Sequence, residues 1–342
     1  MLSSRAKFVE TVSQRQRLTS WVIPTAVVVA IEYSFALLVG YSVGFQYQIP
    51  FADYLLLGLT VAMLVTAAII VAQLAFYAMQ REPAPARRLL GELIRVAAFS
   101  FGAVLIALQM AVLAWTKIML PIASPFWADP LLADIDRALF GSDPWLLANA
   151  SLGSAGAMID QIYVSWAPIK FATTIILLLA SESAAKSRAM IAYFLMMALT
   201  AIGQYSMSSA GPIFYADLGF GPRFEQLPVH YWVEVAKAYL WHDYLRAGGD
   251  IGGGISAMPS LHVAAAVWIA LVWNSFDRRI GAVGVVYASI ILFGSVLLGW
   301  HYFVDGIAGI LITLVAWAAA PWLAKPFLRT RLSPDERVGN PN

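Results

Sequence analysis

The sequence predicts an all-α integral membrane protein that crosses the bilayer about eight times. The chain of 342 residues is 60% hydrophobic and only 12% charged, whereas about a quarter of the residues of a soluble protein are charged. The apolar residues are concentrated in windows of about 20 residues, which is the length that a helix needs to cross the hydrocarbon core. Because backbone polar groups must be satisfied inside lipid, apolar runs of this length are expected to be helices.

Eight windows meet this criterion and define the expected spans. They are residues 21–44, 54–77, 96–120, 162–180, 189–208, 256–275, 280–300 and 302–323. A polar and basic N-terminus precedes the first window, and no small-residue cleavage site follows it, so we expect a retained span rather than a signal peptide. We divide the chain into an N-terminal region with two additional spans (1–95), a six-span catalytic core with two outer loops (96–324) and a cytoplasmic tail (325–342).

The distribution of positive charge predicts the orientation of these spans. If the N-terminus is cytoplasmic, 16 of the 22 Lys and Arg residues fall on the cytoplasmic side, as the positive-inside rule expects. They are Arg5, Lys7, Arg15, Arg17, Arg81, Arg87, Arg88, Arg95, Lys186, Arg188, Arg278, Arg279, Lys325, Arg329, Arg331 and Arg337. This orientation puts both termini in the cytoplasm and two long loops, 121–161 and 211–255, on the non-cytoplasmic (periplasmic or lumenal) face.

The first outer loop combines aromatic residues with Asp129, Asp134, Asp136 and Asp143. Its Leu and Ile spacing predicts short amphipathic helices in the membrane interface. We expect the acidic side chains to be solvated, because their spacing matches no ligand pattern for a divalent cation.

We expect neither a metal centre nor a cofactor. The chain contains no cysteine, which excludes disulfides and thiolate sites, and its net charge of +2 with no basic run gives no indication of nucleic-acid binding.

A first polar motif, SAMPSLH at residues 256–262, leads into the sixth predicted span. The glycines at 252–254 leave the preceding backbone free to approach a ligand closely. Pro259 suits the first turn of a helix, because its missing N–H would be unpaired there. The free N–H groups of that turn, together with the Ser260 hydroxyl, would form an anion site. His262 would then stand beside a phosphate bound there.

A second motif, GWHYFVD at residues 299–305, opens the eighth predicted span. His301 and Asp305 are four residues apart, so on a helix they share one face. A carboxylate beside an imidazole fixes its tautomer and stabilises the cation that forms during reaction. Under the predicted orientation, both motifs lie at the outer ends of helices.

Two histidines that flank a phosphate predict covalent phosphoryl transfer. One imidazole attacks phosphorus, and the other protonates the departing alkoxide and later accepts a proton from water or an alcohol. His301 is the better nucleophile because Asp305 can orient it. His262 has no neighbouring acid in the sequence, so it is the better acid/base.

PSLH followed about forty residues later by HxxxD resembles the second and third signatures of the type-2 phosphatidic acid phosphatase superfamily. Leu261 in place of the usual glycine, with HYFVD as the third signature, makes the pattern most similar to the inositol phosphorylceramide synthase and sphingomyelin synthase branch. The resemblance covers residues 205–324. It implies a six-helix core, His301 as nucleophile, His262 as acid/base, Asp305 as the support of the nucleophile and Ser260 on the phosphate.

The resemblance further implies a membrane-embedded lipid phosphotransferase that moves a phosphate-bearing headgroup between lipids through a phosphohistidine intermediate. The substrate would be a membrane lipid with a phosphate headgroup, and the acceptor a lipid, another alcohol or water. A lipid phosphate phosphatase of the same superfamily is the alternative.

Two departures from the family pattern bear on how a phosphate would be bound. Ser295 stands where the third signature has arginine, and the first signature, K-x6-R-P, does not occur. Fewer cations favour a phosphodiester substrate over a phosphomonoester, because a diester carries less charge. The candidate replacements on the outer side are Arg246, Lys237 and Arg223, with Arg246 preferred because it precedes the glycine-rich approach to His262.

Two questions stay open at this point. The first is whether Glu32 and Lys170, which lie within predicted spans, act on a substrate or are paired with neighbours, since charges there are costly. The second is the class of protein. A non-catalytic lipid transporter would also use broken helices and buried charges. It would need paired repeats, which the sequence lacks, and it does not explain two histidines on one face.

Overall fold

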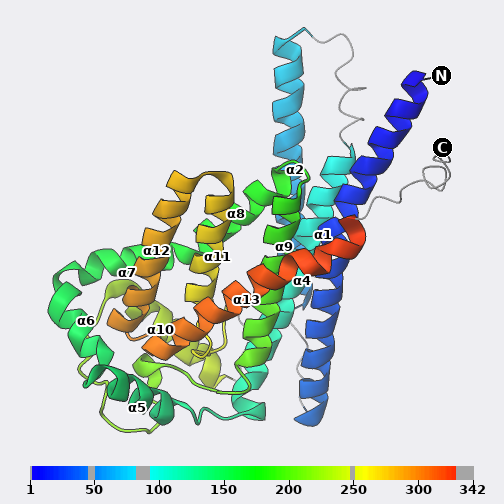
Figure 1. Ribbon diagram of the computed structural model, residues 1–342. Coiled ribbons are helices and arrows are strands. Elements are labelled where there is room, and N and C mark those ends of the chain that lie inside the picture. The colour runs from blue at the N-terminus through cyan, green and yellow to red at the C-terminus, as the bar shows by residue number, and fades with distance from the viewer. Residues whose placement is uncertain (1, 45–50, 82–92, 247–250, 329–342) are drawn as a thin grey trace, which may run out of the picture.

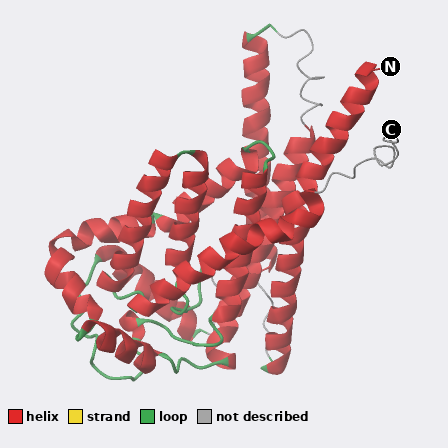
Figure 2. Cartoon of the chain, viewed as in Figure 1, coloured by secondary structure: helices red, strands yellow, loops and turns green. Residues whose placement is uncertain are grey.

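The computed structural model describes residues 2–44, 51–81, 93–246 and 251–328, and no strand occurs among these residues (Figure 2). The longest helices are α1 (Leu2–Ser42), α2 (Phe51–Met79), α4 (Leu93–Ala123), α9 (Ala184–Gly203), α12 (Arg278–Leu297) and α13 (Phe303–Leu328). The shorter α-helices are α5 (Asp129–Phe140), α6 (Pro144–Leu152), α7 (Gly156–Val164), α8 (Trp166–Leu179), α10 (Tyr231–Leu245) and α11 (Leu261–Phe276). Two 3-10 turns, η1 (Gly153–Ala155) and η2 (Pro212–Phe214), complete the chain order (Figure 1).

Each of the eight predicted spans contains an apolar helix, which confirms the all-α polytopic class. Seven helical segments of the described chain are long and apolar enough to cross a membrane. The eighth, α11, is apolar but has only 16 residues, or about 24 Å of helix. The window 162–180 is not one helix, because α7 and α8 meet at Ser165.

Helix α9 is the centre of the bundle. It packs against α1, α4, α11 and α13, and 72% of its most apolar window is buried, against 6% for α2. The side chains of Tyr193 and Phe194 are completely buried there, next to Trp268 of α11. Helix α2 has α4 as its main neighbour and exposes most of its apolar side chains, as expected of a helix that faces lipid.

Helix α1, predicted as an addition to the core, packs into it against α4, α9 and α13. The side chain of Glu32 is fully buried. Its Oε2 accepts a hydrogen bond from Nε2 of Gln109 at 3.0 Å, and the same amide nitrogen donates to the carbonyl of Phe194 at 2.8 Å. Glu32 therefore connects α1 to α4 and, through Gln109, to α9.

Close helix contacts at glycine bring the two motifs together. A Cβ on Gly309 of α13 would lie 2.4 Å from the carbonyl oxygen of Ser260 at the start of α11, so only glycine allows this approach. One turn later, Oγ1 of Thr313 donates to the carbonyl of Ala264 at 3.0 Å. The beginnings of α11 and α13 are consequently held side by side.

The helices of the two predicted outer loops gather at one end of the molecule, at the lower left of Figure 1. Helix α5 buries Leu132 and Ala133 and exposes Leu131 and Leu139, as the sequence spacing predicts for an amphipathic helix. Helix α10 packs on α7. These helices cover the end of the bundle at which α11 and α13 begin.

Candidate active site

Ser260 is the N-cap of α11, whereas the sequence analysis expected the helix to begin before it, with Pro259 in the first turn. Its hydroxyl oxygen accepts the N–H of Val263 at 3.3 Å, and its own N–H donates to the carbonyl of Asp305 at 3.0 Å. The helix begins at Leu261, so Pro259 precedes the helix and does not lie in its first turn. The Ser260 side chain is completely buried. Its capping bond fixes the first turn of α11, in which His262 is the second residue.

His301 lies in a turn before α13 rather than on the helix. The expected shared helix face with Asp305 is therefore wrong, although the two side chains still meet. Nδ1 of His301 lies 3.4 Å from Oδ2 of Asp305, which is long for a hydrogen bond. The same Oδ2 accepts the N–H of Tyr302 at 2.9 Å. The carboxylate thus caps α13 and faces the imidazole at once.

The two histidines of the motifs are in direct contact. Nδ1 of His262 lies 3.0 Å from Nε2 of His301, so one nitrogen carries a proton and the other accepts it. If Nδ1–H of His301 faces Asp305, its Nε2 is unprotonated and accepts the hydrogen bond from Nδ1–H of His262. The ring of His262 is further held by Trp166 and Tyr163, whose ring centroids lie 4.5 and 5.2 Å away.

His301 is 3% exposed, and this burial controls its protonation. Burial lowers the pKa of His301 well below its ordinary value, and the nearby Lys117 charge lowers it further, while the carbonyl of Ala257 opposes the shift. The imidazole is therefore neutral at pH 7. A neutral imidazole is the form that can attack phosphorus.

Two acidic residues of the first outer loop are structural, which corrects the prediction that they are solvated. The carboxylate of Asp136 accepts the N–H groups of Phe303 at 2.6 Å and Val304 at 3.1 Å. Asp129 accepts N–H groups from the two residues 210–211 at 2.9 and 2.8 Å and the hydroxyl of Tyr302 at 3.0 Å. Burial raises the pKa of Asp136 to about 6, against the effect of its backbone donors. Both carboxylates brace the turn that carries His301.

Ser295, at the position of the family arginine, is completely buried and supports the same turn. Its carbonyl accepts the N–H groups of Trp300 at 2.9 Å and His301 at 3.2 Å, and its hydroxyl donates to the carbonyl of Leu292 at 2.7 Å. This position therefore contributes no charge to the site.

A cavity of about 170 Å³ opens beside the histidine pair. Its lining includes His262, His301, Trp300, Asp160 and Lys117. Lys117 was not predicted, although it could have been found by the argument that singled out Lys170, since it is also a charge within an apolar span. Lys117 supplies a cation at the histidines.

Lys170 lies close behind this cavity. Its side chain is completely buried, and its Nζ makes no hydrogen bond to any described residue. Nζ stands 4.8 Å from the ring of Trp166 and 4.6 Å from that of Phe171, which provides cation–π contacts only. The positive charges of both Lys117 and Lys170 act on His262.

The three cations predicted to bind phosphate are absent from the residues that line this cavity. Arg223 is held by Asp134 and Asp143 at 2.6 Å each, and these partners raise its pKa. Lys237 pairs with Asp217 at 2.7 Å, and Arg246 is exposed at the end of α10. The sequence could not show these ion pairs, because their members are up to 89 residues apart.

Among the described residues, no group of three or more His, Asp or Glu side chains is placed to hold a metal ion.

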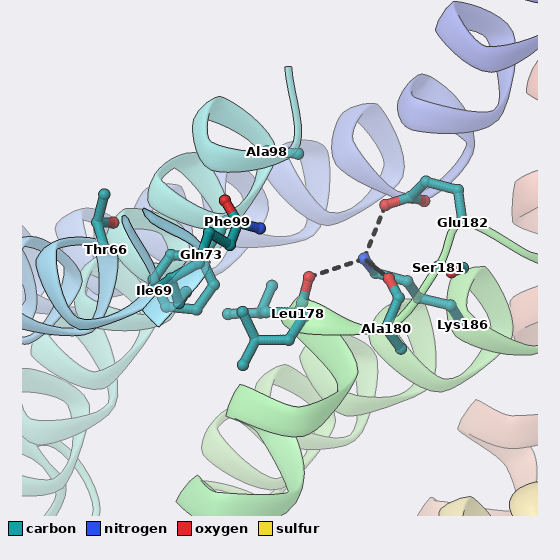
Figure 3. Close-up of a pocket in the computed structure, with 11 residues that line it drawn as sticks. Thr66, Ile69, Gln73, Ala98, Phe99, Leu178, Ala180, Ser181, Glu182 and Lys186 are labelled. Atoms are coloured by element: carbon teal, nitrogen blue, oxygen red, sulfur yellow. Dashed lines mark hydrogen bonds and ion pairs between the residues drawn. The ribbon is translucent and has the colours of Figure 1, made fainter. Parts of the chain in front are cut away.

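A second cavity, of about 120 Å³, is lined by the opposite ends of two helices that also line the first cavity, α4 and α8 (Figure 3). Lys117 and Trp166 border the first cavity, whereas Phe99 of α4 and Leu178 of α8 border the second. Lys186 donates there to Glu182 at 2.7 Å and to the carbonyl of Leu178 at 2.9 Å. The histidine pair and the Lys186 cavity therefore lie at opposite ends of the bundle.

Comparison with known families gives one match. The model described as the PAP2 superfamily matches residues 130–319, a range that contains both histidines, Asp305 and most of the cavity lining. Comparisons with curated proteins and with solved structures gave no match.

Proposed function

Because this chain belongs to the PAP2 superfamily and is therefore a lipid phosphatase or lipid phosphotransferase, we propose that it moves a phosphate-bearing headgroup from one membrane lipid to another. The observation that carries the proposal is the contact of 3.0 Å between Nδ1 of His262 and Nε2 of His301. Two imidazoles at the edge of one cavity, with a carboxylate behind only one of them, have the asymmetry that a nucleophile and an acid/base require.

The proposed reaction has two balanced steps. In the first, Nε2 of His301 forms a bond to phosphorus, the P–O bond to the departing alcohol breaks, and His262 gives that oxygen a proton. In the second, the acceptor alcohol gives its proton to His262, its oxygen bonds to phosphorus, and the N–P bond breaks. Asp305 stabilises the charge that His301 carries in between. A phosphate can enter between the rings only if they separate from their resting contact.

Lys117 takes the phosphate-binding role in this proposal, in place of Arg246, Lys237 and Arg223. It lines the cavity beside both histidines, whereas two of the three earlier candidates are bound by carboxylates. Lys170 adds positive potential from a position that water does not reach. Ser260 has an indirect role in this proposal, because it caps the start of α11, the helix that carries His262.

Transfer is favoured over hydrolysis by the charge of the site. The family arginine is replaced by a buried serine whose polar groups are engaged in the His301 turn. Neutralising a phosphomonoester dianion would need more cations than a diester monoanion needs. The indoles of Trp166, Trp232 and Trp300 in the lining also suit an organic acceptor better than free water.

The catalytic cavity is further proposed to face the non-cytoplasmic side. It lies at the end of the bundle opposite Lys186, one of the basic residues that the positive-inside rule puts in the cytoplasm. The lipid substrate would then come from the outer leaflet.

The test compares lipid extracts by mass spectrometry from cells that express the intact chain and cells that express His301→Ala at equal level. The proposal expects a new headgroup-bearing lipid, with loss of its donor, that depends on His301. Products that consist only of dephosphorylated lipid would support the phosphatase alternative. Activity that survives in His301→Ala would support a transporter.

A further inference from the structure

We propose that Asp160, with the indoles around it, binds the hydrogen-bond-donating part of the lipid headgroup, a hydroxyl or an ammonium group, while Lys117 and the histidines hold the phosphate. This inference rests on the proposed function, because it names the substrate class of the same cavity. It makes the site selective for phosphodiesters whose headgroup donates hydrogen bonds.

The position of Asp160 on α7 puts it near the reacting groups. Tyr163 and Val164 follow it by three and four residues, so all three share one helix face, and all three line the cavity. The ring centroid of Tyr163 lies 5.2 Å from that of His262. Asp160 therefore stands one helical turn beyond a residue that touches the acid/base.

The two carboxylate oxygens of Asp160 have different surroundings. Oδ2 accepts the N–H of Trp232 at 2.8 Å and so caps the start of α10. Oδ1 is buried and forms no hydrogen bond of good geometry with any described residue. The backbone N–H of Val233 and the ring of His230 lie near the same carboxylate, and the residue is 2% exposed. A buried carboxylate oxygen needs a hydrogen-bond donor, and a donor group of a ligand in this cavity would supply one.

The walls around Asp160 fit the same kind of ligand. The cavity has a cation, Lys117, and a carboxylate, Asp160, and three indoles belong to its lining, those of Trp166, Trp232 and Trp300. Indole faces attract ammonium groups and pack against the carbon skeletons of polyols. A headgroup with an anionic phosphate and a donor group beyond it matches this arrangement, whereas a bare phosphate would meet an unpaired carboxylate.

The capping bond offers a purely structural explanation of Asp160, and the choice of variant separates the two. In Asp160→Asn, the amide oxygen can still accept the N–H of Trp232, but the negative charge is removed. Asp160→Ala loses both functions. Asp217→Asn is the matched control, because it removes a carboxylate that pairs with Lys237 outside the cavity lining.

The experiment measures kcat/KM of the full-length protein in detergent micelles with three lipids. Phosphatidylglycerol offers hydroxyl donors, phosphatidylethanolamine offers an ammonium group, and phosphatidic acid has no headgroup alcohol. We expect Asp160→Asn to lower kcat/KM roughly tenfold or more for a donor-bearing lipid and to change phosphatidic acid by less than about threefold. A loss on phosphatidylglycerol identifies a hydroxyl ligand, and a loss on phosphatidylethanolamine an ammonium ligand.

An unchanged kcat/KM of Asp160→Asn on all three lipids, with losses only in Asp160→Ala, would assign Asp160 to the α10 cap alone, and equal losses of Asp160→Asn on all three lipids would also overturn the inference. If the intact chain turns over none of the three lipids, the proposed function fails for these substrates, and binding then decides the inference separately. In that arm, phosphatidylglycerol or phosphatidylethanolamine should raise the Tm of His301→Ala but not that of the His301→Ala, Asp160→Asn double variant. Equal shifts in both variants, or no shift in either, would overturn it.

Discussion

The carboxylate of Asp136 accepts the backbone N–H of Phe303 at 2.6 Å, so a helix of the first outer loop caps the helix that carries Asp305. This bond joins residues 167 positions apart and fixes the first turn of α13 directly after His301. The outer loop is therefore part of the site's framework.

Asp136→Ala should destabilise the protein and lower its activity together. Loss of a buried cap costs about 1–2 kcal/mol, and the freed turn would let His301 depart from its contact with His262. Thermal unfolding in detergent and lipid turnover are the two measurements. Asp134→Ala is the control, because Asp134 is 72% exposed and makes its ion pair on the surface. A normal melting temperature in Asp136→Ala would contradict the capping role.

Lys117→Gln should lower kcat/KM by roughly 10- to 100-fold, because it removes a charge-assisted contact to phosphate of about 1.5–3 kcal/mol. Lys237→Gln, which changes a cation paired with Asp217, should have little effect. Steady-state kinetics on the purified variants measures both. If Lys237→Gln or Arg246→Gln is inactive while Lys117→Gln is not, the phosphate site lies where the sequence first suggested.

Lys170→Met should make the protein more stable and less active. Its ammonium group is completely buried without a hydrogen-bond partner among the described residues, and methionine fills a similar volume without a charge. We expect Tm to rise by roughly 2 °C or more while turnover falls about tenfold through loss of positive potential at the phosphate. Lys325→Met, at an exposed position of α13, should change neither quantity. A fall in Tm would show that Lys170 has a stabilising partner.

Acid-quenched mass spectrometry should find a phosphate-bearing adduct on His301. His262→Ala should still accumulate some adduct, most readily with a substrate whose leaving group needs no proton. His301→Ala should form none, and Asp305→Asn should form it slowly, because the imidazole loses its orientation. An adduct on His262 in the His301→Ala variant would reverse the two roles. Absence of any adduct in an active variant would indicate direct attack by water or alcohol.

Single cysteines test which side of the membrane the cavity faces, since the chain has no cysteine of its own. Ser142 lies between α5 and α6, at the end of the bundle near His301, and Ser275 lies at the opposite end of α11 from His262. In intact cells, an impermeant thiol reagent should label Ser142→Cys and leave Ser275→Cys unmodified until the membrane is permeabilised. The reverse pattern would put the catalytic cavity in the cytoplasm.

The helical membrane class and the pairing of two motifs were predictable from sequence, because both rest on local patterns. Apolar windows of about 20 residues leave helices as the only way to satisfy the backbone in lipid. His262 and His301 each lie next to a span boundary, and an even number of crossings between boundaries puts them at the same end. The remaining features depend on residues far apart in the chain. Asp136 and Asp129 differ from the exposed Asp134 only through what α13 and the Tyr302 turn bring to them.

Only the tertiary structure decided which Lys and Arg side chains remain available to bind a phosphate. Arg223 and Lys237 have the right charge on the predicted side, but carboxylates distant in sequence hold them. Lys117 lies within an apolar span and still lines the cavity. The sequence by itself determined the helices, their membrane character and the two histidine motifs, since hydrophobic length and motif spacing are properties of a continuous segment. Which charges are paired, which backbone groups are capped and where a cavity opens are properties of contacts between segments, and only folding creates those contacts.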